Sequence, residues 1–305
     1  MDPNSPYFKQ VQLLVQVLPI VAKQECFALK GGTAINLFLR ALPRLSVDID
    51  LVYLPIAGRD TSLEQIEKAL LAIQAELETQ GFTVTTSVLK ESNTLIKLIV
   101  ANAASQIKIE VNPVLRGTVH APVVMRVHPA VEQQFGFAEI QLVDFNDLYA
   151  GKLCAALDRQ HPRDLFDVKI LLENEGIDEM LKNTFLVYLI SHGRPLAELL
   201  APNWQSLEAV FAKEFEGMTT VPISNDDLIQ TREAMLARIK MLLTENDKAF
   251  LLGLKQGNPD WASFAYPQAQ HMPAVRWKLH NLQQMNENTR QQAAERLAVA
   301  LNDTL

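Results

Sequence analysis

The sequence lacks the features that mark secreted and membrane proteins. Only two cysteines occur among its 305 residues, Cys26 and Cys154, and both lie within apolar segments. They favour buried thiols in a reducing compartment over a disulfide framework. No apolar run reaches the length that spans a bilayer, and the N-terminus has no signal-peptide layout. We therefore expect a cytoplasmic protein that does not depend on a membrane.

Positive charge is also scarce. The sequence has 28 Lys and Arg against 35 Asp and Glu, a net charge of −7 at pH 7. This balance disfavours a broad face that neutralises nucleic-acid phosphates, although a local basic groove remains open. The six histidines show no metal-ligand spacing. With 48% hydrophobic and 21% charged residues, the composition indicates a folded globular protein of one large domain or two ordinary ones.

The most informative segment joins a glycine turn to a pair of acids. Two adjacent glycines let the backbone approach a ligand, and the helix-like run after them begins with N–H groups suited to an anion. In the following strand-like stretch, Asp48 and Asp50 share one face because successive side chains alternate. A divalent cation such as Mg²⁺ relieves the repulsion between two close carboxylates. The segment predicts nucleotide chemistry, with a solvated strand face as the alternative. The turn consists of Lys30, Gly31, Gly32 and Thr33.

This combination resembles the nucleotidyltransferase superfamily, in which a Gly-Gly or Gly-Ser turn and a short helix precede a strand bearing two acids. The residues Leu29–Ala34 (LKGGTA) and Arg44–Leu51 (RLSVDIDL) are similar to the AbiEii-type toxin family. The resemblance implies an α/β fold with a mixed sheet and flanking helices, followed by a helical C-terminal domain. It also implies metal-dependent transfer of a nucleotidyl group from an NTP, with Mg²⁺ or Mn²⁺ as cofactor.

The same resemblance implies a biological role and partners. The protein would be the toxin of a toxin–antitoxin or phage-defence pair, with a cognate antitoxin as a possible partner. An RNA such as tRNA would be the acceptor of the nucleotidyl group. Two other functions stay open: a nucleotide-binding interaction protein without catalysis, and a nucleotidyltransferase that modifies a protein or a small molecule.

Three strand-like runs after the acidic pair predict an antiparallel meander. They cover residues 82–89, 95–100 and 107–111. In the last run, Lys108 and Glu110 share the face opposite the apolar side chains. Glu110 is therefore the candidate third carboxylate, on a strand next to Asp48 and Asp50, as the superfamily resemblance also implies. An exposed Lys/Glu face on an edge strand is the alternative.

A second charged constellation lies in the helical part of the chain. Lys152 sits within the mostly apolar Leu148–Leu157, so its ammonium must reach water or meet an anion. Arg163, Asp164 and Asp167 open the next expected helix, with both aspartates on one face. This stretch resembles the second block of AbiEii-type proteins, which implies that Lys152 contacts nucleotide phosphate and that Asp164 or Asp167 supports the site. The alternative is a lysine that snorkels to water beside a salt network at a helix start.

Three further residues join the predicted nucleotide site, each with an ordinary alternative. Lys30 could contact phosphate or simply end a strand. Ser46 could orient a ligand or cap a strand, and Arg163 could bind phosphate or pair with a local acid. The predicted catalytic residues are Asp48, Asp50, Glu110 and Lys152, of which the three acids are also the predicted metal ligands. The predicted nucleotide-binding residues are Lys30, Gly31, Gly32, Thr33, Ser46, Arg163, Asp164 and Asp167.

The periodicity changes near residue 145 and predicts two domains. Residues 1–145 would form the nucleotidyltransferase-like α/β domain. Residues 146–305 would form a helical domain that completes the site and binds the acceptor or a partner, with the substrate groove between the domains. From about residue 177 onward the sequence suggests no chemistry, and its three tryptophans are more typical of a core or an interface than of a base-stacking platform.

Overall fold

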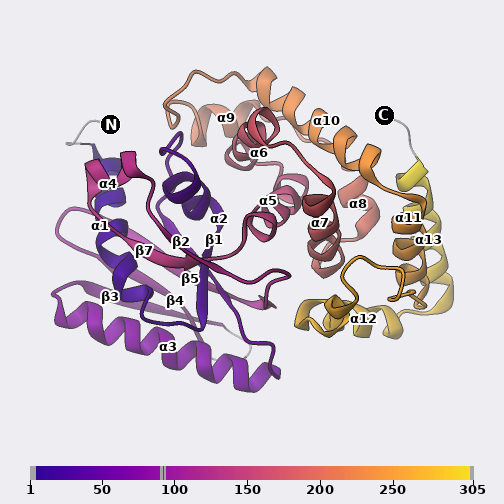
Figure 1. Cartoon of the computed structure of the whole chain (residues 1–305), viewed down its shortest axis with the longest axis horizontal. Coiled ribbons are helices and arrows are strands. Elements are labelled where there is room, and N and C mark those ends of the chain that lie inside the picture. The colour runs from indigo at the N-terminus through magenta and orange to yellow at the C-terminus, as the bar shows by residue number, and fades with distance from the viewer. Residues whose placement is uncertain (1–4, 90–91, 93, 303–305) are drawn as a thin grey trace. The chain divides into compact units, whose positions relative to one another are not determined.

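The computed structural model describes residues 5–89, 92 and 94–302 (Figure 1). Its chain divides into two compact units. The first unit contains the described residues up to Asp144 together with Met218–Val221, and the second contains Phe145–Gly217 and the described residues from Pro222 onward. This division follows Asp144, next to the predicted boundary. The short segment Met218–Val221 returns to the first unit because Thr219 forms a β-bridge with Arg44.

A seven-stranded mixed sheet forms the first unit, in the order β3-β4-β5-β2-β1-β7-β6. The pairs β2–β5 and β1–β7 are parallel, and the other neighbours are antiparallel. The predicted antiparallel meander of β3, β4 and β5 is confirmed. The strands are β1 Phe27–Lys30, β2 Asp48–Tyr53, β3 Thr83–Leu89, β4 Thr94–Ala101, β5 Gln106–Arg116, β6 Val123–Arg126 and β7 Glu139–Leu142.

Helices α1 and α3 pack against this sheet (Figure 1). The alternation along β2 turns Ile49 and Leu51 into the core, where both are fully buried. Helix α3 supplies an apolar stripe at helical spacing and ends just before Gly81, which has φ +87°. It begins at Arg59. The helices of this unit are α1 Pro6–Val21, α2 Gly31–Thr33, α3 Arg59–Thr79 and α4 Pro129–Phe135.

The run predicted as a helix after the glycine turn is helical but irregular. Helix α2 passes directly into a π-helical turn over Ala34–Leu39, and Leu42 has a positive φ of 55°. The side chains of Ala34, Ile35 and Leu37 are fully buried. This apolar turn anchors the glycines to the core of the first unit.

The second unit is helical, as predicted. Helix α5 packs on α6 and α7, with Tyr149, Leu153 and Phe185 fully buried. Its helices are α5 Phe145–Arg159, α6 Pro162–Asn174, α7 Glu179–Ser191, α8 Leu196–Leu200, α9 Glu208–Glu214, α10 Asn225–Leu242, α11 Glu245–Gln256, α12 Pro273–Gln284 and α13 Glu287–Asn302, with a 3-10 helix at Pro267–His271. In the described part of the chain, no helix combines the length and apolarity needed to cross a membrane. The expected α/β architecture with a helical C-terminal part is confirmed.

The two cysteines are thiols without a disulfide, but they differ in burial. Cys154 is buried in α5, as predicted, whereas Cys26 is only half-buried, so the prediction of two buried thiols is wrong for Cys26. Cys26 lies in the turn before β1, where the chain reaches the surface before entering the sheet. Desolvation by burial raises the pKa of both thiols.

Candidate active site

The parallel pairing of β2 with β5 gathers three carboxylates on one face of the sheet. In this register Asp48 lies beside Lys108, and Asp50 lies beside Glu110. Paired residues on neighbouring strands point to the same side of a sheet, and Asp48 and Asp50 already share a side through the alternation along β2. The structure thus places Glu110 on the strand next to both aspartates, at the position predicted from the sequence. We call the side chains of Asp48, Asp50, Lys108 and Glu110 the acid face.

Lys108 lies between two acids of this face. Its Nζ is 3.0 Å from Oε2 of Glu110 and 3.9 Å from Oδ2 of Asp48. A second lysine, Lys97 on β4, places its Nζ 3.8 Å from the same Glu110 oxygen. The side chains of Asp48 and Glu110 are 44% and 36% exposed, so a ligand from solvent can reach them. The sequence placed Lys108 on this face, but its bridging position follows only from the strand register.

The same environment raises the pKa of Lys108. Partial burial acts to lower it, but the hydrogen bond to Glu110 and the negative charges of Asp48, Glu110 and Asp50 outweigh burial, so the pKa is raised above its ordinary value. The ammonium is therefore firmly charged at neutral pH. It supplies a fixed positive charge among the three carboxylates.

The glycine turn comes close to the acid face because β1 pairs with β2. Lys30 lies beside Asp50 in this antiparallel register. Gly31 has φ +75°, and a Cβ there would lie 2.7 Å from Oδ2 of Asp50. A Cβ on Gly32 would lie 2.7 Å from Oγ of Ser46. The positive φ favours glycine at position 31, and a Cβ at either glycine would displace the end of a neighbouring side chain, that of Asp50 at Gly31 and that of Ser46 at Gly32.

Two hydroxyl groups tie this turn to the acidic strand. The Thr33 hydroxyl donates to the backbone carbonyl of Asp48 at 2.5 Å, and its Oγ1 lies 3.1 Å from Oγ of Ser46. Thr33 is 1% exposed. These bonds fix the glycine turn relative to β2, so Thr33 and Ser46 position the predicted site whether or not they also touch a ligand.

Arg44 is a residue of this region whose role was not predicted from the sequence. It is 3% exposed, its Nη1 donates to the carbonyl of Leu45 at 2.6 Å, and its Nη2 lies where a Cβ on Gly32 would come within 2.6 Å. A buried guanidinium against a glycine backbone supports the turn from behind. The sequence hint to its importance was its position at the start of Arg44–Leu51, a stretch that resembles the AbiEii family.

The second predicted constellation forms a buried ion-pair cluster within the second unit. Nζ of Lys152 on α5 is 2.8 Å from Oδ1 of Asp164 and 2.9 Å from Oδ2 of Asp167, both on α6. All three side chains are at most 6% exposed, so Lys152 meets anions and does not snorkel to water. Arg159 also contacts Asp164, at 2.9 Å, whereas Arg163 is exposed. We call Lys152, Asp164 and Asp167 the buried cluster.

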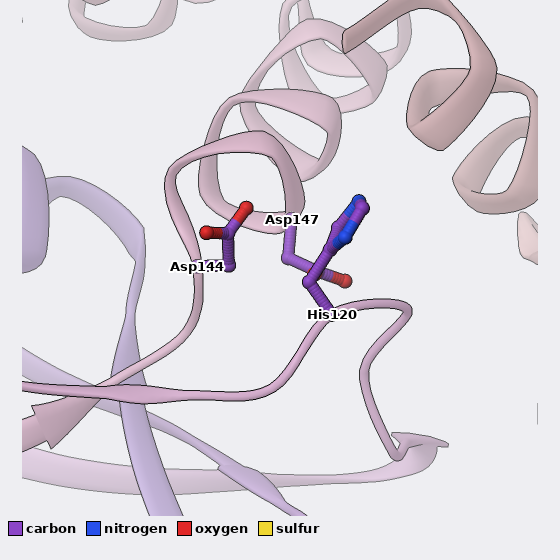
Figure 2. Close-up of side chains that lie close together, drawn as sticks. All are labelled: His120, Asp144 and Asp147. Carbon is purple, nitrogen blue, oxygen red and sulfur yellow. The ribbon is translucent and has the colours of Figure 1, made fainter. Parts of the chain in front are cut away.

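Another group of potential metal ligands is drawn in Figure 2. His120 and Asp144 of the first unit each offer a ligand atom within 4.8 Å of the other. Asp147 lies in the first turn of α5 and accepts a hydrogen bond from the Tyr188 hydroxyl at 2.9 Å, within the second unit. A single His and a single Asp from one unit fall short of a complete metal-binding set, so we assign no metal to them.

Comparison with known proteins identifies the family. A family model described as nucleotidyl transferase AbiEii toxin, type IV toxin–antitoxin system, matches residues 12–281. The chain belongs to this family. The resemblance first noticed in two short motifs is thereby confirmed, and this AbiEii-family chain is a nucleotidyltransferase toxin of a type IV toxin–antitoxin system.

A solved structure agrees at the level of the fold. The AbiEii-family chain is similar to MenT4, a nucleotidyltransferase toxin from Mycobacterium tuberculosis H37Rv, with a TM-score of 0.59 and 15% sequence identity. The match covers 91% of this chain and 93% of that chain. At this identity the likeness shows a shared fold. No curated protein sequence matches the chain.

The acid face has the donor chemistry that a nucleotidyltransferase metal requires. Carboxylate oxygens are hard ligands, and Mg²⁺ is typically held by one or two of them together with substrate phosphates. Asp48 and Asp50 meet this requirement from one strand, beside the glycine turn that follows β1. The residues therefore fit a divalent metal.

Proposed function

We propose that this chain is a metal-dependent enzyme that transfers a nucleotidyl group from an NTP to an acceptor hydroxyl. The observation that carries the proposal is the pairing of β2 with β5, which brings Asp48, Asp50 and Glu110 to one face beside the Gly31-Gly32 turn. Family membership supports the reaction class. Family membership alone does not identify the catalytic residues, the metal or the acceptor, and these are what we propose.

In the proposed reaction, the acceptor oxygen attacks the α-phosphorus of the NTP. The bond from the α-phosphorus to the oxygen that bridges it to the β-phosphorus breaks, and pyrophosphate leaves with that electron pair. Asp48 and Asp50 would hold the divalent metals, which supply Lewis-acid stabilisation of the charge on the phosphoryl oxygens. Glu110 would share one metal or take the proton of the acceptor hydroxyl as general base.

The glycine turn would bind the nucleotide phosphates. Gly31 and Gly32 present backbone without side chains, and Thr33 and Ser46 hold that backbone against β2. Lys30 adds a positive charge beside Asp50, from the neighbouring strand. Binding of this kind depends on positioning and electrostatics, which are the main sources of catalysis in transfer at phosphorus.

The buried cluster would supply further charge for the nucleotide. We propose that Lys152 stabilises negative charge on the phosphates, with Arg163, Asp164 and Asp167 as supporting residues. The Lys152 ammonium pairs with both aspartates, so it would have to break one of these ion pairs to contact a phosphate directly. A purely structural role for the cluster is the competing explanation, and transfer per folded molecule in Lys152→Met separates the two.

For the acceptor we propose RNA, with tRNA as the first candidate, in a toxin that acts in the cytoplasm and serves in phage defence. The net charge of −7 favours a local contact with RNA over a broad basic surface. A protein or small-molecule acceptor is the second possibility. A nucleotide sensor without catalysis is disfavoured, because Asp48, Asp50 and Glu110 all remain on one face.

Incubation of the full-length chain with each α-labelled NTP, Mg²⁺ or Mn²⁺, and total RNA or cell lysate tests this function. We expect label on an RNA species with one NTP, and no label with EDTA or with the Asp50→Asn variant. Label on a protein band would overturn the RNA acceptor but keep the enzyme. Nucleotide binding without any transfer would overturn the catalytic proposal.

A further inference from the structure

The acid face contains a cation of its own. Lys108 stands on β5 directly beside Asp48 and two residues before Glu110, and its ammonium contacts an oxygen of each acid at 3.9 and 3.0 Å. Lys108 therefore stands between two of the three acids.

The position of Lys108 divides the acid face into two parts. One part is the bridge from Glu110 through Lys108 to Asp48. The other is Asp50, whose carboxylate faces the glycine turn, with Oδ2 2.7 Å from the position of a Cβ on Gly31. A unit positive charge within 4 Å of two carboxylates performs the electrostatic task of a bridging metal ion, and it also repels a metal ion that approaches the same oxygens.

We propose that Lys108 is a built-in cation that occupies the position between Asp48 and Glu110, so that the nucleotide-free chain binds one divalent ion, through Asp48 and Asp50. This inference rests on the proposed function, because it concerns the same acids. Lys108 acts as a positioning residue: it holds Glu110 toward β2 and blocks a second ion at the bridge. Its side chain is 34% exposed, which leaves it room to turn toward solvent.

Lys97 provides a matched control in the same sheet. It also pairs with Glu110, at 3.8 Å, but it stands on β4, and the strand order β4-β5-β2 places it on the far side of β5 from Asp48. Replacing either lysine by methionine removes one positive charge near the same carboxylate. Only the Lys108 variant opens the bridge between Asp48 and Glu110.

Titration of the full-length chain with Mn²⁺ alone tests the inference, with bound Mn²⁺ counted by electron paramagnetic resonance. We expect one ion per chain in the wild type, in Lys108→Arg and in Lys97→Met. Lys108→Met is expected to bind a second ion and to bind Mn²⁺ about tenfold more tightly overall, because it loses a repelling charge about 4 Å from the site. Lys97→Met should change the affinity less than about threefold.

The outcomes separate this inference from the proposed function. Equal Mn²⁺ binding by Lys108→Met and Lys97→Met would overturn the role of Lys108 and leave the metal site intact. Unchanged Mn²⁺ binding by Asp50→Asn would overturn the metal site itself, and so would a wild-type chain that binds no Mn²⁺. If Lys108→Met does not fold, Lys108→Gln gives the same comparison, with the Mn²⁺-induced rise in melting temperature as a second readout.

Discussion

The two charged clusters of this protein use the same residue types in opposite surroundings. On the acid face, Lys108 and its partners Asp48 and Glu110 are each between 34% and 44% exposed. In the buried cluster, Lys152 and its partners Asp164 and Asp167 are at most 6% exposed. The carboxylates of the acid face lie on a sheet surface, and those of the buried cluster lie on a helix packed against another helix.

The difference in burial predicts different consequences of substitution in the two clusters. A buried charge needs a partner inside the protein, because removing one member of a buried pair costs about 3–5 kcal/mol. Exposed ion pairs contribute only about 0–1 kcal/mol, so the acid face can exchange its lysines for a ligand at little cost to the fold. Substitutions on the acid face should therefore reduce transfer, and substitutions in the buried cluster should reduce stability.

The largest expected effect comes from the acids of β2. Asp48→Asn or Asp50→Asn should reduce nucleotidyl transfer by about a thousandfold, since each removes a charged metal ligand, while changing the free energy of unfolding by less than about 1 kcal/mol. Label transfer and urea unfolding measure the two quantities. Asp60→Asn, at an exposed acid of α3, is the matched control and should leave both unchanged. Near-normal turnover in Asp50→Asn would remove the acid face from the mechanism.

The buried cluster is tested by Lys152→Met. This variant leaves Asp164 and Asp167 buried without their lysine and should lower the free energy of unfolding by about 3–5 kcal/mol. Lys169→Met, which removes a surface pair with Glu173 on α6, should cost less than about 1 kcal/mol. Unchanged stability in Lys152→Met would contradict the account of the cluster.

Transfer per folded molecule then decides the catalytic role of Lys152. A loss of about a hundredfold is expected if its ammonium stabilises charge in the transition state. The measurement is made at a urea concentration and temperature where the variant is folded. Unchanged turnover per folded molecule would reduce Lys152, Arg163, Asp164 and Asp167 to scaffold.

Glu110→Gln should give an intermediate result on the acid face. Transfer is expected to fall by about a hundredfold, because a general base or a metal ligand is lost. Mn²⁺ binding should survive, since Asp48 and Asp50 remain. A variant that keeps full activity would place the third acid elsewhere, and one that loses all Mn²⁺ would make Glu110 a principal ligand.

The smallest expected effect on transfer comes from Gly31→Ala. Its comparison with Gly81→Ala distinguishes backbone strain from contact with the site. Gly31→Ala and Gly81→Ala both place a Cβ on a backbone with positive φ, which costs about 1–2 kcal/mol in each case. Only the Cβ at Gly31 meets Asp50, whereas nothing lies within 4 Å of the Cβ at Gly81. Gly31→Ala should therefore lower transfer by about tenfold, through displacement of a positioned group. Equal activity in the two variants would contradict the close approach of the turn to Asp50.

The family resemblance and the change of periodicity together predicted the fold class, and local patterns predicted the positions of the acids. Alternation placed Asp48 and Asp50 on one face, and the predicted meander placed Glu110 on a nearby strand. The bridging position of Lys108 could not be predicted, because the register of β2 against β5 joins segments separated by a long helix and two strands. The support from Arg44 was missed for the same reason, since it depends on tertiary packing.

The end of strand β5 also differs from the prediction, for a local reason. The last strand of the predicted meander ended at Val111. In the structure β5 continues to Arg116, and the Asn112 side chain accepts hydrogen bonds from the backbone N–H groups of Val114 and Leu115, both at 2.9 Å. The register against β2 shifts in this region, and such an irregularity accommodates a proline within a strand.

The central claim is that the acid face directs transfer of the nucleotidyl group, and a double-label reaction tests it most directly. The full-length chain is incubated with the accepting RNA and the preferred NTP, labelled in parallel at the α- or the γ-phosphate. The account predicts that the α-label joins the acceptor, that the γ-label leaves in pyrophosphate, and that Asp50→Asn abolishes both events. Transfer of the γ-label to the acceptor, or α-label transfer that persists in Asp50→Asn, would contradict it.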